Sequence, residues 1–358
     1  MKVNVGMYTL KKLIFILLLT VFFSGLLASC SSSGVNQLPQ QTPGTNESPD
    51  TPADDPAQED PNQEDPSSTN PVLPDRRLGE VQIGAYIKGA TWDKTLLHEL
   101  EDSLGHEFNI IQWFTSWPAP FEPYIVNRVI DLNRKPLITW QSNAQTLDSI
   151  LNGRHDAYIR SWARGAKKVS GEIYLRPFPE MNGDWTLWNG NPAKLVRAWK
   201  HIVDIFREEG ANNVLWVWSP NITDEPATAT NRMELYYPGD DYVDVLGLDG
   251  FNWGTVRPWT AWKSFEETFT VPYRRITALG DQPLWLAEIA STEKGGNKAT
   301  WITDMLNSTN FPRIDALIWF NEVKETDWRI ESSHASEAAF KAWFTQRALE
   351  QSLASANP

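Results

Sequence analysis

Eight short apolar runs recur between Leu78 and Leu353, and helical patterns separate most of them. Apolar runs of strand length that alternate with helix-length segments are typical of parallel strands covered on both faces. The predicted strands are Val81 to Tyr86, Phe108 to Phe114, Pro136 to Gln141, Glu172 to Arg176, Val214 to Ser219, Val243 to Asp249, Leu284 to Glu288 and Ala316 to Phe320. The predicted helices are Trp92 to Leu104, Pro123 to Asn133, Asp156 to Val169, Pro192 to Glu209, Trp262 to Leu279, Lys298 to Asn307 and Ser336 to Leu353. The pattern predicts an α/β fold, a (β/α)8 TIM barrel in one domain, with irregular structure around Asp224 to Tyr237.

The predicted strand that begins at Glu172 leads directly into a carboxylate. Pro177 and Pro179 cannot donate to a sheet, so the strand is expected to open into a loop at Glu180. If the chain stays extended, Arg176 and Glu180 share one face. In a parallel barrel the carboxyl ends of the strands carry the chemistry. Glu180 is therefore a candidate catalytic residue, and the alternative is a glutamate in an ordinary surface ion pair.

A second carboxylate, Glu288, ends the predicted strand that begins at Leu284. This strand is apolar on both faces, as in the interior of a parallel sheet. A glutamate there is costly to ionise unless a cation or several donors meet it. We expect Arg176 to be that cation. The alternative is a buried Arg-Glu pair without a catalytic role.

Tryptophan occurs 18 times, and many copies fall at or just after predicted strand ends. The apolar face of a pyranose ring stacks on an indole, whereas its hydroxyl groups need amide and charged partners. This distribution favours a sugar-binding cleft, although any single tryptophan more often belongs to the core, as we expect for Trp216. The predicted substrate-binding residues are Arg176, Asn182, Trp185, Trp188, Trp218, Asn221, Trp253, Trp319, Asn321, Trp113 and Trp140.

The amino-terminal 77 residues have a different composition. Basic residues precede the apolar run Leu13 to Leu27, which predicts a secretory signal peptide over residues 1–30. The four residues that end at Cys30 resemble a bacterial lipobox, which implies cleavage before this cysteine and its lipidation. Residues 31–77 are acidic and rich in proline, which predicts a disordered tether before the domain at 78–358. We therefore expect an exported protein that contacts the membrane only through a lipid anchor, in the outer membrane or at the cell surface.

Other chemistries have little support in the sequence. There is no Gly-x-Ser-x-Gly, phosphate loop or dinucleotide fingerprint, and the five histidines lack metal-ligand spacing. We expect neither a metal nor a cofactor. The formal net charge of −13 and the lack of a basic stripe argue against nucleic acid as a partner. The acidity is compatible with a neutral substrate, and we expect a monomer.

Several motifs together resemble glycoside hydrolase family 26. They are Arg176-Pro177 with Glu180 to Trp185, Gly247 to Trp253, Ala287-Glu288 and Trp319 to Asn321. The resemblance implies a (β/α)8 barrel with Glu180 as acid/base and Glu288 as nucleophile. It also implies a β-glycan substrate, which is most often β-1,4-mannan and in some members mixed-linkage β-glucan or β-1,3-xylan. This chain departs from the family at Pro179, which usually is histidine, and at Phe251, which in many members is tyrosine.

The two glutamates are expected to have opposite environments. Glu180, partly desolvated by Trp185, should have a raised pKa and donate a proton, whereas Glu288, held ionised by Arg176 and Asn321, should attack the anomeric carbon. This predicts a retaining hydrolase, with an endo-β-1,4-mannanase favoured over a mixed-linkage β-glucanase or a β-1,3-xylanase. A glycan-binding lipoprotein without turnover remains an alternative because of Pro179. A barrel hydrolase with a non-sugar substrate is a further alternative.

Overall fold

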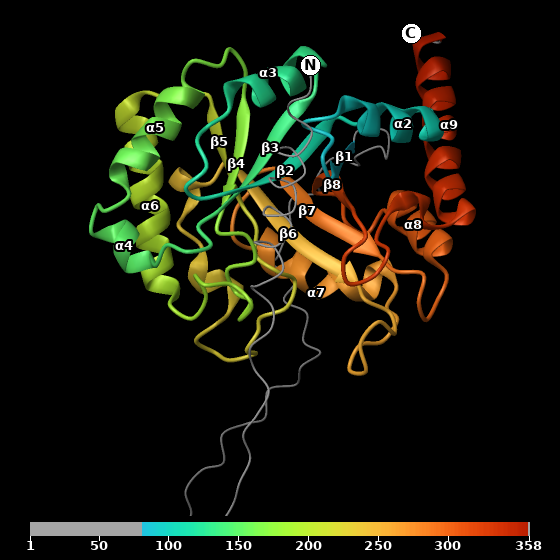
Figure 1. Ribbon diagram of the computed structural model, residues 1–358. Helices are drawn as coiled ribbons and strands as arrows, with labels where there is room; N and C mark the ends of the chain where they lie inside the picture. The colour runs from blue at the N-terminus through green and yellow to red at the C-terminus, as the bar shows by residue number, and fades with distance from the viewer. Residues whose placement is uncertain (1–80, 357–358) are drawn as a thin grey trace, which may run out of the picture. The chain divides into compact units, whose positions relative to one another are not determined.

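Each of the eight predicted apolar runs forms a strand in the computed structural model, which describes residues 81–356. The strands are parallel and close into a barrel in chain order (Figure 1). They are β1 (Gln82–Ile87), β2 (Ile110–Ser116), β3 (Lys135–Gln141), β4 (Ile173–Pro177), β5 (Val214–Trp218), β6 (Val245–Asn252), β7 (Leu284–Ser291) and β8 (Ile314–Asn321). The predicted TIM barrel is confirmed.

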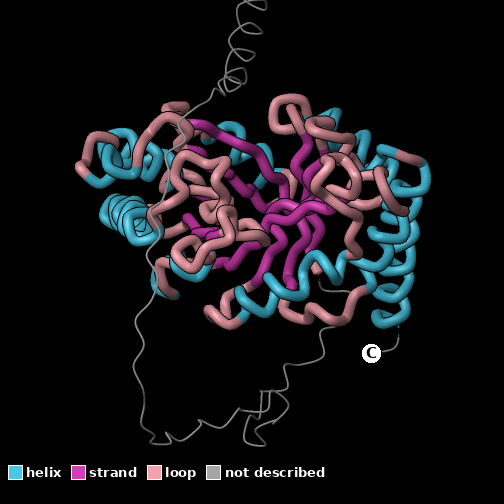
Figure 2. The backbone as a smooth tube through the Cα atoms, turned by 90° about the horizontal axis from the view of Figure 1, so that it is seen from below, coloured by secondary structure: helices cyan, strands magenta, loops and turns pink. Residues whose placement is uncertain are grey.

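Helices surround the barrel, so that strands lie in the centre and helices at the periphery (Figure 2). They are α2 (Lys94–Leu104), α3 (Pro123–Asp131), α4 (Leu147–Leu151), α5 (Asp156–Ala166), α6 (Pro192–Glu209), α7 (Phe265–Thr277), α8 (Lys298–Asn307) and α9 (His334–Ala356). The short helix α4 was not predicted. The expected irregular span between β5 and β6 holds only the 3-10 turns Met233–Tyr236 and Asp240–Tyr242 among its described elements.

Local signals fix the ends of the helices that match the prediction. Asn191 caps α6 by accepting a hydrogen bond from the Lys194 amide at 3.0 Å, and Gly210 ends the helix in the left-handed region at φ 75°. Asn297 caps α8 in the same way by accepting from the Thr300 amide at 3.0 Å. These caps place the helix starts at the carboxyl edge of the sheet, where the βα loops gather.

The core has two layers, which the strand alternation separates. Inward-facing side chains fill the barrel, and outward-facing side chains pack against the helices. The barrel interior contains Ile110, Leu137, Tyr174, Val217, Val245, Trp285, Ala316 and Ile318. The polar inward-facing residues described below follow this apolar plug toward the carboxyl edge.

The chain divides into residues 1–69 and 70–358, and all described residues belong to the second unit. The predicted signal peptide, the lipidated Cys30 and the tether at 31–77 lie outside the described residues. Within residues 81–356, no helix has the length and apolarity needed to cross a membrane.

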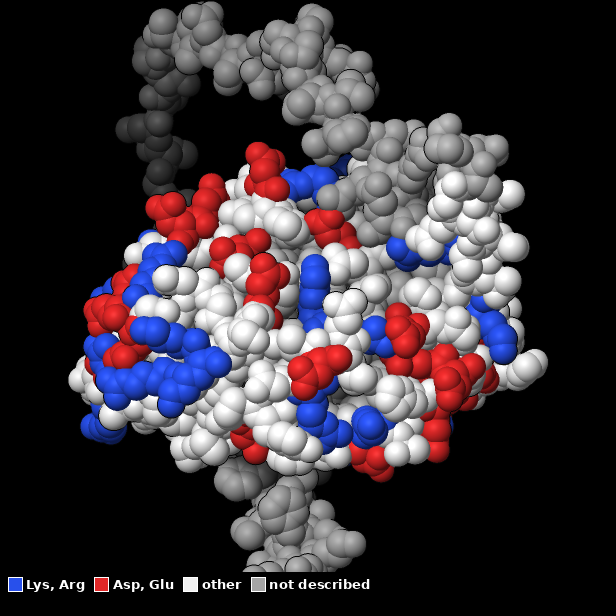
Figure 3. All heavy atoms as spheres, turned by 90° about the horizontal axis from the view of Figure 1, so that it is seen from above, with Lys and Arg blue, Asp and Glu red and all other residues white. Residues whose placement is uncertain are grey.

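Basic and acidic side chains lie next to one another on the face seen in Figure 3. Between α5 and α6, Arg160 pairs with Glu208 at 2.7 Å and Arg164 pairs with Glu209 at 2.7 Å. These exposed pairs neutralise part of the basic charge of the two helices. The prediction that nucleic acid is not a partner stays a prediction.

Candidate active site

A buried arginine forms the centre of the polar cluster above the apolar plug. Arg176 is on β4, points into the barrel and has no exposed surface. Its Nη2 atom donates to Asp249 Oδ2 at 3.1 Å and to Glu288 Oε1 in a very short contact. The predicted Arg176–Glu288 pair is present. Asp249, which sequence reasoning missed as a site residue, is the second acidic partner.

The neighbours of this cluster fix its geometry. Ser219 Oγ donates to Asp249 Oδ1 at 2.6 Å, and Arg176 Nη1 lies 3.4 Å from the carbonyl oxygen of Ala287. The Gln112 amide is satisfied best when its oxygen accepts from Arg176 Nη1 at 2.8 Å and its nitrogen donates to Ala287 at 3.1 Å. This orientation is assigned from the hydrogen bonds. The guanidinium is therefore held from β2, β6 and β7 together.

Glu288 reaches the barrel interior because β7 carries a bulge. Trp285 faces inward and Leu286 outward, so strict alternation would turn Glu288 outward toward the helices. The register with β6 pairs Leu248 with Leu286 but Asp249 with Glu288, which leaves one extra residue on β7. A bulge of this kind changes the direction of the following side chain. Glu288 therefore points at Arg176.

Glu180 reaches the site by a different local structure. The strand ends at Pro177, and both Phe178 and Glu180 adopt left-handed backbone conformations, at φ 51° and 54°. Such values cost about 1–3 kcal/mol for a non-glycine residue and must be imposed by the surroundings. The Glu180 amide donates to the Ser219 carbonyl at 2.9 Å, and this bond ties the turn to β5. Strand alternation alone therefore does not explain the direction of Glu180.

Two neutral donors hold the Glu180 carboxyl group. Asn221 Nδ2 donates to Oε1 at 2.6 Å, and Trp185 Nε1 donates to Oε2 at 2.8 Å. Burial and then the negative charge of Glu288 raise the pKa of Glu180 above its ordinary value, although the two donors lower it. Glu180 is therefore the carboxyl group prepared to carry a proton.

Three carboxyl groups face the single guanidinium of Arg176. Burial, opposed by Arg176 and reinforced by Glu288 and Glu180, raises the pKa of Asp249 well above its ordinary value. Burial alone would lower the pKa of Arg176, but the charges of Asp249 and Glu288 raise it instead. The excess of carboxyl groups over cations favours retention of a proton within the cluster.

Two predicted binding residues instead support the loop that carries Glu180. The Asn182 side chain is buried, donates to the Asn221 carbonyl at 2.9 Å and accepts from the Asn221 amide at 2.8 Å. Trp188 is buried and donates to the Pro179 carbonyl at 3.0 Å. Both side chains therefore hold the loop in place and lack the exposed surface that a sugar would contact.

Four of the predicted sugar-binding tryptophans point away from the cleft. They lie on the outer face of the barrel, where they pack in the layer between strands and helices: Trp113, Trp140, Trp218 and Trp319. Trp140 packs on Trp162 of α5 at a centroid distance of 4.6 Å, and Trp319 packs on Phe340 of α9 at 5.2 Å. Their assignment to substrate binding is corrected here, because alternate strand positions face opposite sides.

Asn321 is also placed differently from the prediction. Its side chain accepts from the Ile330 amide at 2.6 Å and donates to Glu331 Oε2 at 3.0 Å. It thus holds the loop between β8 and α9 and is not among the partners of Glu288 described above.

An aromatic wall joins the carboxyl ends of β1, β2, β6 and β8. It comprises Tyr86, Phe114, Phe251, Trp253, Phe320 and Trp328. Tyr86 lies 4.8 Å from Phe114 and 4.9 Å from Phe320, measured between ring centroids. Of these residues only Trp253 was predicted as a binding residue, and it is partly exposed. Inward parity on β1, β2, β6 and β8 is the signal that identifies Tyr86, Phe114, Phe251 and Phe320, whereas Trp328 lies in the loop after β8 and has no such signal.

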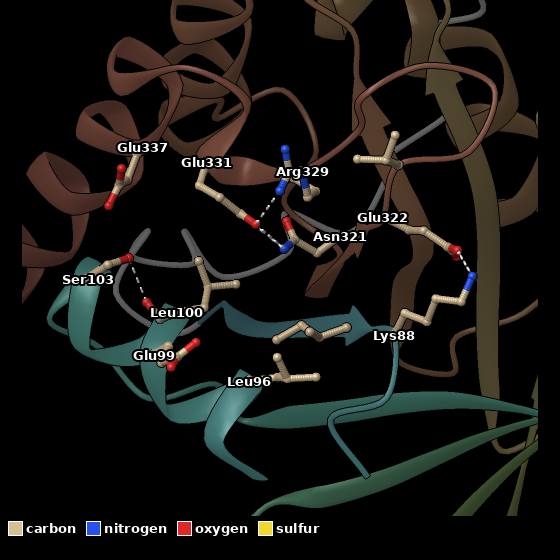
Figure 4. Close-up of a pocket in the computed structure, with 12 residues that line it drawn as sticks. Lys88, Leu96, Glu99, Leu100, Ser103, Asn321, Glu322, Arg329, Glu331 and Glu337 are labelled. Atoms are coloured by element: carbon tan, nitrogen blue, oxygen red, sulfur yellow. Dashed lines mark hydrogen bonds and ion pairs between the residues drawn. The ribbon is translucent and has the colours of Figure 1, made fainter. Parts of the chain in front are cut away.

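A cavity of about 500 Å³ lies at the carboxyl ends of β1 and β8, next to α2 (Figure 4). Its lining combines Ile87 and Lys88 with residues of α2 and of the loop between β8 and α9. Lys88 Nζ pairs with Glu322 Oε1 at 2.6 Å at one side of the cavity. Burial and the charges of Glu322 and Glu288 raise the pKa of the Tyr86 hydroxyl group. Ile87 and Asn321 occupy outward-facing positions of β1 and β8, so the cavity lies on the outer side of these two strands.

Among residues 81–356, no group of three or more histidine, cysteine, aspartate or glutamate side chains has the arrangement of a metal site. The expectation that no cofactor is required stays a prediction.

Residues 134–292 match the family model described as glycosyl hydrolase family 26. The match covers a little less than half of the chain. The matched region extends from the residue before β3 to the residue after β7 and contains both Glu180 and Glu288. The match agrees with the family resemblance, and the barrel fold that the resemblance implies is confirmed.

Individual relatives extend the similarity over most of the described barrel. Endoglucanase H of Acetivibrio thermocellus is 38% identical over 275 residues, which are 73% of this chain and 30% of the relative. Mannan endo-1,4-beta-mannosidase A and B of Caldalkalibacillus mannanilyticus is 30% identical over 131 residues, which are 34% of this chain and 22% of that protein. This chain thus spans less than a third of the length of either relative.

A solved structure agrees with the barrel architecture. A modular endo-beta-1,4-mannanase from Cellulomonas fimi matches with a TM-score of 0.58 and 16% identity, over 75% of this chain and 71% of that chain. At this identity the likeness concerns the fold.

Proposed function

We propose that the chain is a retaining glycoside hydrolase that cleaves a β-linked polysaccharide. The observation that supports it best is the contrast between the two carboxyl groups at the carboxyl ends of β4 and β7. Glu180 is held by neutral donors and has a raised pKa, whereas Glu288 is paired with the buried Arg176. Such a division provides an acid and a nucleophile in one cleft.

In the first step Glu288 attacks the anomeric carbon, while Glu180 gives its proton to the departing glycosidic oxygen. The bond from carbon to the leaving oxygen breaks as the bond to the carboxylate oxygen forms, which gives a covalent glycosyl-enzyme. In the second step Glu180, now ionised, takes a proton from water, and the water oxygen displaces Glu288. Two displacements restore the original configuration, and they require a carboxyl separation of about 5–5.5 Å.

Arg176 and Asp249 have supporting roles in this mechanism. Arg176 balances the charge of Glu288 before attack and orients the carboxylate toward the cleft. Asp249 keeps the guanidinium in place through its 3.1 Å ion pair, and Ser219 holds Asp249 in turn. Neither residue needs to exchange a proton during turnover.

For the polymer, we propose β-1,4-mannan first, in agreement with the family resemblance and with the mannosidase relative. A β-glucan is a second candidate, because the similarity to Endoglucanase H is higher and covers more of this chain than the mannosidase match. Phe251 in the cleft and Pro179 in the β4 loop differ from the residues that are usual in the family. The contacts that these two positions offer to a sugar therefore differ from those of typical members.

Release of reducing ends from mannan, glucomannan, mixed-linkage glucan, xylan and β-1,3-xylan tests the proposal. The wild-type protein should act on at least one polymer, and Glu180→Ala and Glu288→Ala should each abolish that release. Release that survives both substitutions would contradict the assigned pair. Binding to a polymer without release by the wild-type protein would instead support the non-catalytic glycan-binding alternative.

We further propose that the protein is exported as a monomer and anchored in the cell envelope through lipid on Cys30. The proposal is compatible with the described barrel, because the chain enters at the amino end of β1, at the edge opposite Glu180 and Glu288. Mass spectrometry of the mature amino terminus tests it. A lipid-modified residue 30 is expected in the wild-type protein, and an unmodified amino-terminal peptide that still contains Met1 would contradict the proposal.

A further inference from the structure

The exposed aromatic side chains of the described residues are confined to one edge of the barrel. Among the large hydrophobic residues that are exposed there, the aromatic ones are Trp92, Tyr124, Trp185 and Trp259, at 62%, 67%, 53% and 80%. Three lie in connections that follow the carboxyl ends of β1, β4 and β6, and Tyr124 lies in the first turn of α3, which follows β2. This is the edge that carries Glu180 and Glu288. Large exposed rings at the rim of a cleft are typical of a binding surface.

Trp92 and Tyr124 are joined by one side chain although Trp92 precedes α2 and Tyr124 lies in the first turn of α3. Arg128 Nη1 donates to the Trp92 carbonyl oxygen at 3.3 Å. The guanidinium carbon of the same residue lies 5.4 Å from the centroid of the Tyr124 ring. The two exposed rings therefore belong to one surface element, which we call the β1–β2 platform and define as Trp92, Tyr124 and Arg128.

The backbone beneath Trp92 is fixed while its indole is open to solvent. The amides of Trp92 and Asp93 both donate to the Gly89 carbonyl at 2.9 Å. Gly89 has φ 85°, a value that suits glycine in such a turn. Asp93 then caps α2 by accepting from the Thr95 amide at 3.0 Å. Because the backbone is already fixed, a ligand that stacks on the exposed ring should lose less affinity to the conformational-entropy cost of binding.

The position of the platform in the barrel predicts which end of a bound polymer it contacts. Glu180 must contact the leaving-group oxygen, so the aglycone side of a bound polymer lies toward β4. In a closed barrel with strands in chain order, β8 is opposite β4, and β1 and β2 follow it. The glycone part of a polymer therefore extends toward β8 and β1, and β2 borders that side. The β1–β2 platform lies on that side.

The cavity of Figure 4 lies beside the turn that carries Trp92. Its lining includes Lys88, which directly precedes Gly89, and Leu96, which lies in the first turn of α2. Lys88 pairs with Glu322 of the loop after β8 at 2.6 Å. The connection after β1 that carries Trp92 is therefore in contact with the connection after β8 at the carboxyl edge.

We propose that the β1–β2 platform is a distal subsite that stacks on sugar rings of the glycone side of a β-glycan polymer. The inference rests on the proposed function for its orientation. A β-linked polymer presents apolar ring faces along its length, and exposed indole and phenol rings match these faces without charge. Arg128 adds donors at the edge of the rings, where hydroxyl groups project. The site therefore favours long substrates over short ones.

Affinity electrophoresis through gels that contain mannan or mixed-linkage glucan tests binding without turnover. The variants are Trp92→Ala, Tyr124→Ala and the double variant, with Leu349→Ala on α9 as a matched loss of an exposed apolar side chain. Each platform substitution should weaken polymer affinity by about two- to tenfold, and the control should match the wild-type protein. Equal mobility of the wild-type protein and the double variant in every gel would overturn the proposal.

Kinetics on substrates of different length give the second readout. For the polymer, the platform variants should raise KM and leave kcat within about twofold, because uniform binding is lost far from the bond that breaks. For an aryl disaccharide, both constants should be unchanged. An equal loss on short and long substrates would overturn the distal subsite and indicate a damaged centre. If the wild-type protein is retarded but releases no sugar, the proposed hydrolase function fails, while the gel result still decides the platform.

Discussion

Glu180 and Glu288 lie at the ends of β4 and β7, and the chain uses opposite means to place them. Glu180 lies in a left-handed turn at φ 54°, is partly exposed and accepts hydrogen bonds from the neutral donors Asn221 and Trp185. Glu288 lies in a regular strand that one bulge redirects, and it is paired with a buried cation. The comparison indicates how one barrel edge can provide both a proton donor and an anion.

The environments differ in what they stabilise. Neutral donors allow a carboxyl group to be protonated or ionised at modest cost, whereas a buried guanidinium strongly favours the ionised form. The backbone strain at Glu180 and Phe178 is held by bonds from β5 and from Trp188. Substitutions around Glu288 and Arg176 should therefore affect the buried ion pairs and the stability of the fold. Substitutions around Glu180 should affect the protonation of its carboxyl group and the position of that group in the cleft.

Loss of either carboxyl group should have the largest effect on activity. Substrates with different leaving groups distinguish the loss of Glu180 from the loss of Glu288. Glu288→Ala should lower kcat on every substrate by about 10⁴-fold or more, because the covalent step is removed. Glu180→Ala should lower kcat on polymer by about 10²- to 10⁴-fold. On an aryl glycoside with an acidic leaving group, the first step of Glu180→Ala should be much less impaired, as a pre-steady-state burst would reveal. An equal loss in both variants on the aryl substrate would contradict the division of roles.

Removal of the buried partner of Arg176 should be the most damaging for stability. Asp249→Asn leaves the guanidinium with one acidic partner in a fully buried site. We expect the free energy of unfolding to fall by about 3–5 kcal/mol, measured by urea denaturation. Glu180→Gln is the matched control, since it removes a carboxylate that has no cationic partner in direct contact. It should change stability by less than about 1 kcal/mol. Equal destabilisation by both would remove the contrast between the two sides.

The pH dependence should report the donors of Glu180. The acid must be protonated to act, so kcat/KM falls when the pH rises through the pKa of Glu180. Asn221 stabilises the ionised form and lowers that pKa. Asn221→Ala should therefore move the alkaline limb of the kcat/KM profile to higher pH. A shift to lower pH would indicate that another group limits activity in this range.

The smallest expected effect concerns the support of the β4 turn. Trp188→Phe removes the 3.0 Å hydrogen bond to the Pro179 carbonyl, next to Glu180, and should lower stability by about 1 kcal/mol and kcat several-fold. Trp199→Phe is the control, because it removes an equivalent 2.9 Å bond to the Tyr242 carbonyl in the helical layer. It should cost similar stability and leave kcat unchanged. Equal kcat in the two variants would show that the turn does not depend on Trp188.

The sequence predicted the barrel and the Arg176–Glu288 pair because both depend on patterns that local residues carry. Apolar runs, caps and chain order were sufficient for the strands and for two helices with the predicted bounds, α6 and α8. The position of Glu288 could be expected from chain order, but its direction could not. Its neighbours Leu284 and Leu286 face outward, and only the bulge between β6 and β7 separates it from them.

The sequence could not predict which tryptophans face the cleft. Proximity to a strand end does not decide which side of the sheet a residue faces, and Trp218 faces outward while its neighbour Ser219 contacts Asp249. Trp216, predicted as core, is buried on the same outer face as Trp218. The exposed Trp92 and Tyr124 were not recognised, because they lie at the starts of helices, where the turn before Trp92 and the packing around the first turn of α3 decide the exposure.

The most direct test of the division between Glu180 and Glu288 is the configuration of the first product. Proton NMR during early hydrolysis of the best polymer or oligosaccharide follows the anomeric signals before mutarotation equalises them. Our account predicts that the β-anomer appears first, as two displacements at one carbon require. Initial formation of the α-anomer would mean that water attacks directly and that Glu288 is not the nucleophile.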